Sequence, residues 1–339
     1  MTGEVEVEVI RIRPGWMLEH SNLLVFAVVP LFWGALITTQ AQPASYWLEY
    51  WWMFPIALVF ATTANTTGIS GAALFVPFFL LVFPLIAGHA LPPQQSVLLG
   101  LVTEAFGLSS SGLAFFRFGL VDKKMAALTA LGATPFIIAG AALSFVLPKY
   151  AFYFLVGLAL AGAAYLMFSK LRRDSKLECI EKKIIDHQDP QHEQNVDLFT
   201  RDGQEYLYCR HGWGTRFAGY GFGGLFQGIG GFGLGELGIV SMLRTDIPLR
   251  VAIGTTHAVV AFGAIVAASS HLIGIGLAGE TPPWNIAFMT VPAVILGGQL
   301  APYVAARFKP ETLELIVASL FVLLAVVLGF LGVRGVLVP

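Results

Sequence analysis

Two glycine-rich stretches decide the fold of this chain: Asn65-Thr66-Thr67-Gly68-Ile69-Ser70-Gly71 and Gly228-Ile229-Gly230-Gly231-Phe232-Gly233. Each stretch interrupts an apolar region that would otherwise be long enough for a membrane-spanning helix. Glycine weakens a helix interior, and Ser, Thr and Asn offer the backbone competing hydrogen bonds. Irregular backbone survives at membrane depth only where it lines a cavity or is buried in protein. The sequence therefore predicts two broken helices inside a membrane protein.

The composition around these breaks is that of a polytopic membrane protein. Hydrophobic residues make up 56% of the 339 residues and charged residues 12%, whereas a soluble domain has about 25% charged residues. Residues 1–20 and 169–216 hold 24 of the 41 charges, so the rest of the chain is nearly uncharged. A net charge of -1 offers no basic face to a nucleic acid. Soluble enzymes and nucleic-acid binders are excluded, and we expect a polar tail at 1–21 and a polar loop at 169–216.

Apart from the broken regions, seven apolar stretches are long enough, or nearly so, to cross a bilayer. They are 22–38 (an extra helix within 22–40), 95–116, 125–147, 151–168, 251–273, 284–306 and 313–332.

The placement of Lys and Arg indicates that the broken regions do not cross. Cytoplasmic loops collect positive charge. If residues 53–87 crossed fully, the basic turn that holds Arg117, Lys123 and Lys124 would lie outside. If 53–87 enters and returns, that turn and the basic start of 169–216 both lie inside. The same argument holds for 217–243. We predict seven crossings and two re-entrant hairpins, with the N-terminus and the 169–216 loop in the cytoplasm.

This arrangement contains an internal repeat. Residues 53–168 and 217–332 each hold a re-entrant broken helix followed by three transmembrane helices. Because three crossings are an odd number, the two units insert with opposite orientation. Inverted repeats with glycine-broken segments at matching places are typical of secondary transporters, whose substrate site lies where the breaks meet. The predicted fold class is an all-α polytopic membrane protein made of two inverted repeats and one extra N-terminal helix.

The polar regions carry one strand pattern. Residues 4–9 alternate Glu and Val, as a strand does, and residues 205–210 alternate similarly. A lone strand is unstable, so we expect these two stretches to pair in a small cytoplasmic cap.

The breaks are suited to binding an anion. At the start of a helix, the free N–H groups and the helix dipole favour negative charge. A half-helix begins after each break, near residues 70–72 and 233–234, and inverted halves point both starts at one place. The surroundings are rich in neutral donors and poor in fixed positive charge, which suits a small oxyanion that must bind and leave. The predicted substrate-binding residues are Asn65, Thr66, Thr67, Ser70, Gly71, Gln227, Gly230, Gly231, Gly233, Thr255 and Thr256. Within this set, Ser70 and the four glycines are expected to supply backbone donors.

Three ionisable residues stand out within the apolar regions: Glu104, Glu236 and His257. Such residues are costly in a membrane and commonly functional. Burial disfavours a charged carboxylate, and His changes charge near physiological pH, so proton coupling is one hypothesis for the three. The other hypothesis is that each residue is a satisfied polar link between helices.

The chain resembles the TauE/SafE family of sulfite and organosulfonate exporters. The resemblance rests on Thr67-Gly68-Ile69-Ser70-Gly71-Ala72-Ala73-Leu74-Phe75-Val76-Pro77, on 228–233, and on Pro248-Leu249-Arg250-Val251-Ala252-Ile253-Gly254-Thr255-Thr256, and it covers about residues 53–332. It implies export of a small sulfur-containing oxyanion, such as sulfite, sulfoacetate or a related sulfonate, across the plasma membrane. The chain departs from the family pattern at residues 70–73, where a glycine triplet is expected, and in its long 169–216 stretch. No cofactor is predicted, and a homodimer is an open alternative to a monomer.

Three other functions compete with a carrier. A passive anion channel would share the polar lining but need no proton groups. An intramembrane serine protease would use Ser70, in Gly68-Ile69-Ser70-Gly71, with His257 as base, but the matching 228–231 stretch has no serine. A metal site in the polar loop would use Cys179, His187, His192, Cys209 and His211, whose spacing matches no zinc pattern. The sequence therefore favours the carrier, with the channel as the main alternative.

Overall fold

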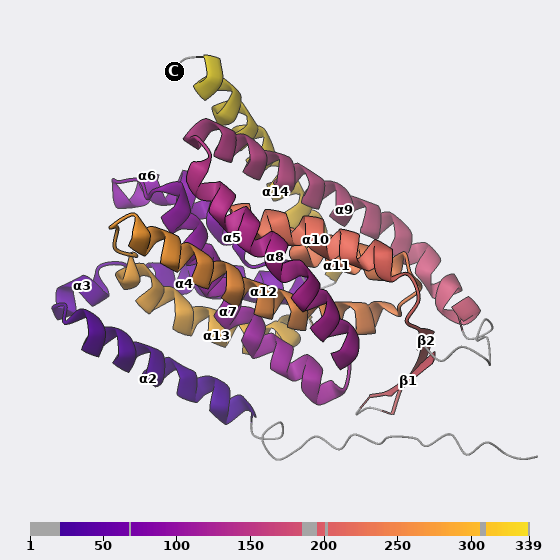
Figure 1. The fold of residues 1–339 in the computed structure, drawn as a ribbon. Helices are drawn as coiled ribbons and strands as arrows, with labels where there is room; N and C mark the ends of the chain where they lie inside the picture. The colour runs from indigo at the N-terminus through magenta and orange to yellow at the C-terminus, as the bar shows by residue number, and fades with distance from the viewer. Residues whose placement is uncertain (1–20, 68, 185–194, 201–202, 306–309, 338–339) are drawn as a thin grey trace, which may run out of the picture.

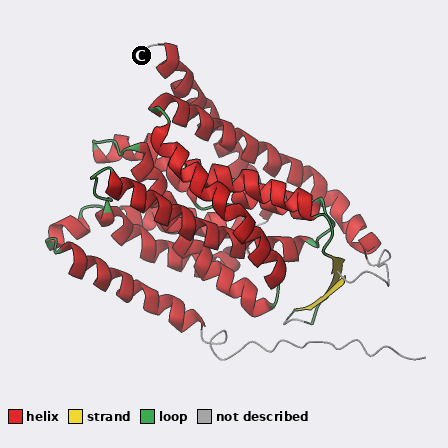
Figure 2. Cartoon of the chain, viewed as in Figure 1, coloured by secondary structure: helices red, strands yellow, loops and turns green. Residues whose placement is uncertain are grey.

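A computed structural model describes residues 21–67, 69–184, 195–200, 203–305 and 310–337. Figures 1 and 2 show an assembly of helices with one β-hairpin at its margin. Within the described residues, six helices are long and apolar enough to cross a membrane: α7, α8, α9, α12, α13 and α14. The predicted all-α polytopic membrane fold is confirmed.

The helices follow the predicted order along the chain. They are α2 (Ser21–Gln40), α3 (Ala44–Leu48), α4 (Met53–Thr67), α5 (Ala72–Pro77), the π-helix η1 (Phe78–Val82), α6 (Phe83–Ala87), α7 (Pro93–Phe118), α8 (Lys123–Val146), α9 (Lys149–Ile184), α10 (Trp213–Gly230), α11 (Leu234–Leu243), α12 (Leu249–Leu277), α13 (Trp284–Ala305) and α14 (Pro310–Leu337). Helix α9 continues to Ile184, so the polar stretch predicted as a loop from residue 169 begins as helix.

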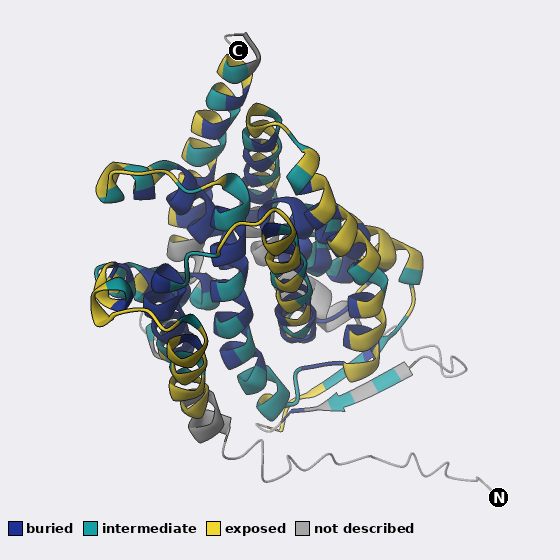
Figure 3. Cartoon of the chain, turned by 60° about the vertical axis from the view of Figure 1, so that its left-hand side comes forward, coloured by how far each residue is buried: buried dark blue, intermediate teal, exposed yellow. Residues whose placement is uncertain are grey.

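The predicted extra N-terminal helix is α2. It packs on α13, where Trp33 Nε1 donates to the Phe288 carbonyl at 2.8 Å and the two rings stack 5.1 Å apart. Much of its remaining surface is exposed, which is visible along the outer margin of Figure 3. An apolar helix with an exposed face at the edge of such an assembly fits a lipid-facing position.

The first broken region is a helical hairpin. The Phe60 ring of α4 lies 5.4 Å from Phe75 and 5.5 Å from Phe78, whereas Trp52, near the start of α4, lies 5.8 Å from Phe83. Residues earlier in α4 therefore meet residues later in the returning segment, which makes the two arms antiparallel.

The second broken region is also a helical hairpin. A Cβ atom at Gly223 would lie 2.8 Å from the Gly233 carbonyl oxygen, and one at Gly219 would lie 2.5 Å from the Ser241 Cβ. Helices α10 and α11 thus run antiparallel and so close that side chains are excluded between them, which is how small residues act in membrane helix packing.

Helices of each half pack on helices of the other half. Helix α4 of the first hairpin packs on α13 of the second half, and α10 of the second hairpin packs on α8 of the first. Helices α7 and α12 pack on each other, as do α9 and α14. Two related units would produce this pattern. The division into repeats at 53–168 and 217–332 stays a prediction, which the pattern supports.

The small sheet contains a strand that the sequence analysis did not predict. Strand β2 (Glu205–Cys209) lies within the predicted stretch, but its partner is β1 (Asn195–Phe199), with Asn195 opposite Cys209 and Phe199 opposite Glu205. The expected partner, residues 4–9, lies outside the described residues. Pairing across a short loop has a low closure entropy, and Thr200 further links its N–H and hydroxyl to the Gln204 carbonyl at 2.9 and 2.8 Å.

Candidate functional site

The two breaks meet in the interior of the protein. Helix α4 ends at Thr67 and α5 begins at Ala72, while α10 ends at Gly230 and α11 begins at Leu234. A Cβ atom at Gly231 would lie 3.1 Å from the Ala72 Cβ, so the two breaks are in direct contact. Gly231 and Gly233 have φ of +86° and +114°, conformations that side chains disfavour. The second break therefore depends on glycine for its course.

Glu104 of α7 is a hydrogen-bond acceptor for both halves. The Ser70 hydroxyl donates to its Oε1, and Gln227 Nε2 of α10 donates to its Oε2. Glu104 is 2% exposed and Gln227 is fully buried. A buried carboxyl group is stable only with such partners. The sequence placed these three residues in one site, and the structure brings them into contact.

Glu236 joins the two breaks through the backbone. It lies in the first turn of α11, where its Oε2 accepts the Gly233 N–H at 3.0 Å. Its Oε1 accepts the Ser70 N–H at 3.3 Å. One N–H comes from each break, so a single carboxyl group accepts a backbone hydrogen bond from both breaks. The position of Glu236, three residues after Gly233, is the acidic part of a capping box, a signal that could have predicted the bond to Gly233.

A small cavity of about 10 Å³ adjoins this centre, roughly the space of one water molecule. It is lined by Ile69, Ser70, Leu108, Gly235, Thr256, His257 and Val260. His257 is 4% exposed, and its Nδ1 lies 2.9 Å from the Ile253 carbonyl oxygen. Among the described residues, His257 Nε2 and Gln227 Oε1 are buried with no hydrogen-bond partner. Such unpaired buried groups are rare in proteins and point to a ligand or a solvent molecule.

Several predicted residues lie in the helix ends around this centre without joining it. Asn65 Nδ2 donates to the Ala61 carbonyl at 2.8 Å, and its Oδ1 is buried and unpaired. The Thr66 hydroxyl contacts the Thr62 carbonyl at 2.7 Å and the Ala301 carbonyl of α13 at 3.3 Å. The side chain of Thr67 lies outside the described residues.

The glycines of the two breaks were expected to supply backbone N–H donors to the site, and the structure gives several of them other contacts. The Gly231 N–H donates to the Gln227 carbonyl at 2.9 Å, which completes the end of α10. What Gly231 presents to Ser70 is its carbonyl oxygen, 3.4 Å from the hydroxyl. A Cβ at Gly230 would face Val156 and Phe232, and one at Gly71 would face Glu104. Thus Ser70 and Gly233 provide backbone donors to Glu236, and Ala72 provides one to Glu104.

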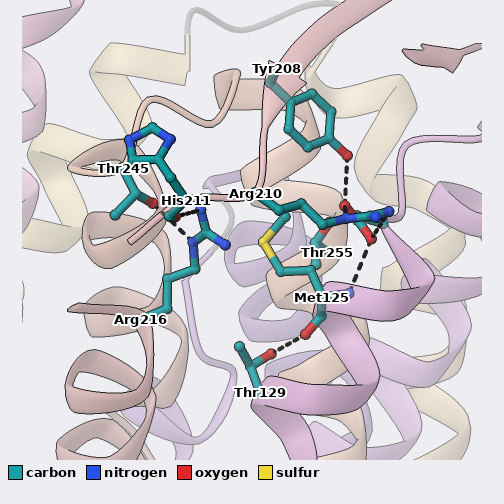
Figure 4. A network of polar contacts seen from close by, with 9 residues as sticks. Met125, Thr129, Tyr208, Arg210, His211, Arg216, Thr245 and Thr255 are labelled. Carbon is teal, nitrogen blue, oxygen red and sulfur yellow. Dashed lines mark hydrogen bonds and ion pairs between the residues drawn. The ribbon is translucent and has the colours of Figure 1, made fainter. Parts of the chain in front are cut away.

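Thr255 belongs to a second polar cluster, shown in Figure 4. Its hydroxyl accepts the Asp122 N–H at 3.0 Å. The Asp122 carboxylate caps α8 by accepting the Met125 N–H at 3.0 Å, and it accepts bonds from Tyr208 at 2.8 Å and from Arg210 at 2.7 and 3.0 Å. This cluster fastens the β-hairpin to the turn between α7 and α8. The neighbouring Thr256 instead contacts the Tyr220 hydroxyl at 2.7 Å and lines the cavity.

The electrostatics of Asp122 follow from these contacts. Burial alone would raise the pKa of Asp122, but the bonds from Arg210, the Met125 N–H and Tyr208 outweigh it and hold the pKa below its ordinary value. Burial, followed by the nearby Asp122 charge, raises the pKa of Tyr208. Sequence reasoning missed this cluster, since Asp122 and Arg210 are 88 residues apart.

Comparisons with known proteins place the geometry in context. Residues 53–328 match the family model described as sulfite exporter TauE/SafE. A probable membrane transporter protein, YunE of Bacillus subtilis (strain 168), is 23% identical over 286 residues, which cover 82% of this chain and 96% of that protein. No solved structure matches. The matched region contains both hairpins, the centre at Glu104 and Glu236, and all six long apolar helices in whole or in part.

Proposed function

Because the chain belongs to the TauE/SafE family of sulfite exporters, we propose that it exports a small sulfur-containing oxyanion across the plasma membrane. The chain is a multi-pass membrane transporter of that family. Sulfite, sulfoacetate and related sulfonates are the proposed substrates. The N-terminus and the 169–216 stretch lie in the cytoplasm in this proposal, as the placement of Lys and Arg indicates.

The single observation that carries this proposal is the use of the Ser70 and Gly233 N–H groups. Both donate to the oxygens of one carboxyl group, Glu236. Backbone donors at helix starts favour anionic oxygens. A sulfite or sulfonate group presents oxygens of the same kind. The meeting point of the breaks thus has the donor chemistry of an oxyanion site.

Transport in this proposal occurs by alternating access. The two halves contact each other through the Glu104–Gln227 and Glu236–Ser70 bonds. These bonds can open and re-form as one half moves against the other, since each joins residues of different hairpins or helices. Glu104, Glu236 and His257 are the candidates for carrying a coupled proton, because they line or adjoin the cavity within one connected polar centre.

Uptake into proteoliposomes tests the proposal. Purified protein is offered sulfite, sulfate, thiosulfate, sulfoacetate and taurine, with and without an imposed pH gradient. We expect sulfite or a sulfonate to be moved, and an outwardly or inwardly directed pH gradient to accumulate it above equilibrium. Equilibration alone, with no accumulation under any gradient, would favour the passive anion channel. Movement of none of the five would refute the substrate class.

Ser70→Ala separates transport from proteolysis. The Ser70 hydroxyl donates to Glu104, whereas a protease would pair it with a base such as His257. We expect the variant to retain transport with a changed KM, since the Ser70 N–H is unaffected. Neither the wild type nor the variant should cleave a membrane-helix substrate. Proteolysis by the wild type that Ser70→Ala abolishes would establish the serine protease instead.

A further inference from the structure

We propose that the Glu236 carboxylate is a tethered competitor of the transported anion. It occupies the backbone donors that an anionic substrate would use, and the substrate binds by replacing it. This inference rests on the proposed function, because it names the regulation of that same site.

The contacts of Glu236 resemble those of a bound anion. Its two oxygens take one N–H from each break, at 3.3 Å from Ser70 and 3.0 Å from Gly233. Glu236 is 8% exposed and lies at the start of α11, a helix of ten residues. A free oxyanion with two oxygens at these positions would make the same bonds. Carboxylate and substrate therefore cannot hold these donors together.

The adjacent cavity independently indicates where a ligand would extend. His257 lines it and has a buried Nε2 without a partner, and Gln227, which bonds to Glu104, has an unpaired buried Oε1. The cavity holds about one water molecule, which is too little for a sulfur atom with three oxygens. Ser70, whose N–H bonds to Glu236, and Gly235, the residue before Glu236, both line this cavity, so an anion that extends from it to the Ser70 N–H must displace the Glu236 carboxylate. Entry of the anion is thereby linked to release of the carboxylate.

The other carboxyl group of the centre has a different role. Glu104 accepts bonds from the Ser70 hydroxyl and from Gln227, which are side-chain donors. A backbone bond from Ala72, at the first break, also reaches Glu104, but none of the bonds made to Glu104 by the described residues comes from an N–H of the second break. Glu104 is a positioning residue in this scheme, and it provides the matched control for Glu236.

The remaining ionisable groups on the elements packed against α11 lie around rather than on these donors. Tyr220 of α10 contacts Gly238 further along α11 and bonds to Thr256. His271 of α12 bonds to the Gly228 carbonyl at 2.8 Å. Arg216 lies near the start of α10, where it bonds to Thr245 at 2.9 Å. Glu236 is thus the ionisable side chain, among these, that accepts backbone N–H bonds from both breaks.

Competition gives the transporter a means of release. Donors left empty by a departing anion would be buried and unpaired, which is costly. The tethered carboxylate takes them up, so the empty state is stabilised and the affinity for substrate is reduced. A carrier that must discharge its anion on each cycle needs such moderate affinity.

Chemical rescue tests the inference. Thermal unfolding of Glu236→Ala is compared with that of the wild type at one pH, with sodium formate and sodium sulfite titrated at constant ionic strength. Without anion, Glu236→Ala should unfold at a lower temperature than the wild type. Formate, a free carboxylate, should raise the Tm of the variant more than that of the wild type. Sulfite should bind the variant at least about tenfold more tightly, since one competing charge-assisted contact is removed.

Two further variants complete the experiment. Glu236→Gln keeps the side-chain shape and should also bind sulfite more tightly than the wild type, which covers the case in which Glu236→Ala does not fold. Glu104→Gln should show no gain in sulfite or formate affinity. Sulfite affinity of Glu236→Gln equal to or weaker than that of the wild type would overturn the inference, as would an equal gain in Glu104→Gln.

The failures of the two proposals are distinguishable. If the wild type moves none of the sulfur anions but formate still rescues Glu236→Ala, the carboxylate position is an anion site and the substrate class is wrong. If the wild type transports sulfite and neither anion discriminates the Glu236 variants, the proposed function stands and Glu236 is only a helix cap.

Discussion

The two breaks occupy corresponding places in the chain but are built differently. At the first break, Gly71 has φ of -61° and ψ of -41°, an ordinary helical conformation. At the second, Gly233 has φ of +114° and follows another left-handed glycine, Gly231. The first break thus needs no glycine at its cap, whereas the second does. The comparison shows that the N-cap residues of α5 and α11 are both glycine, but that only the second has a conformation that favours glycine.

The chemistry contributed by the two breaks also differs. The first supplies the Ser70 hydroxyl and N–H, while the second supplies the Glu236 carboxylate and the Gly233 N–H. The first break therefore provides donors, and the second provides the Glu236 acceptor to which the Ser70 N–H bonds. Because the Glu236 bond to Ser70 crosses between the halves, the centre exists only when both hairpins are in place.

The largest expected effect concerns the helix crossings that hold the hairpins. A Cβ at Gly140 of α8 would overlap the Leu225 carbonyl oxygen of α10, so Gly140→Ala must separate the two backbones. At the matching crossing of α13 on α4, a Cβ at Gly297 would lie 2.7 Å from the Ala61 methyl group. We expect Gly140→Ala to cost about 3 kcal/mol or more, and Gly297→Ala roughly 1–3 kcal/mol, because overpacking against backbone relaxes least.

Size-exclusion profiles and thermal unfolding in detergent measure these losses. Gly162→Ala in α9 is the control, because a Cβ there has no neighbour within 4 Å, and it should be neutral or slightly stabilising, by at most about 1 kcal/mol. Equal stability of Gly140→Ala and Gly162→Ala would contradict the close crossing of α8 and α10.

A smaller loss of stability is expected when the acidic residues in the turns after α7 and α12 are replaced, and the loss should differ between the two turns. Asp122, after α7, is buried and holds Arg210 and Tyr208, whereas Glu280, after α12, is exposed and accepts one bond from Gln95 at 2.9 Å. Asp122→Asn should cost about 2–3 kcal/mol at neutral pH through loss of charge-assisted bonds. Glu280→Gln should change stability by less than about 0.5 kcal/mol, as exposed polar pairs contribute little.

The stabilisation that Asp122 provides should decrease as the pH falls. The pKa of Asp122 in the folded protein lies below its ordinary value of 3.8, so its stabilising contribution is complete above that value. It is lost as the pH falls through the lower, folded pKa. The stability difference between the wild type and Asp122→Asn should be constant above about pH 5 and shrink below about pH 4. A difference that instead grows on acidification would refute the charged role of Asp122.

Much of the fold was predictable because membrane helices are identified by the length and apolarity of their sequences. The breaks were predictable too, since glycine and hydroxyl residues inside an apolar run disfavour a continuous helix. Glu104, Glu236 and His257 were identified as candidates because ionisable groups are rare in such runs. Their proton-coupling role stays a proposal.

Other features depend on contacts that residue spacing does not encode. The bond from the Ser70 N–H to Glu236 joins residues 166 positions apart. The Asp122 cluster and the placement of Thr255 in it depend on where the β-hairpin packs. The pairing of β1 with β2 was not predicted, because alternation identifies a strand but does not choose its partners, and β1 lies only a short loop away.

The smallest expected effect tests the comparison of the two breaks directly. Gly233→Ala places a side chain at φ of +114° and 3.0 Å from the Phe226 Cβ, so it should cost at least about 1–2 kcal/mol. Gly71→Ala, at the matching cap, has helical φ and ψ and no atom nearer than 3.8 Å. It should be neutral or stabilising by about 0.4–1 kcal/mol. Thermal unfolding of the two variants measures the difference, and equal Tm values would show that the two caps are physically equivalent after all.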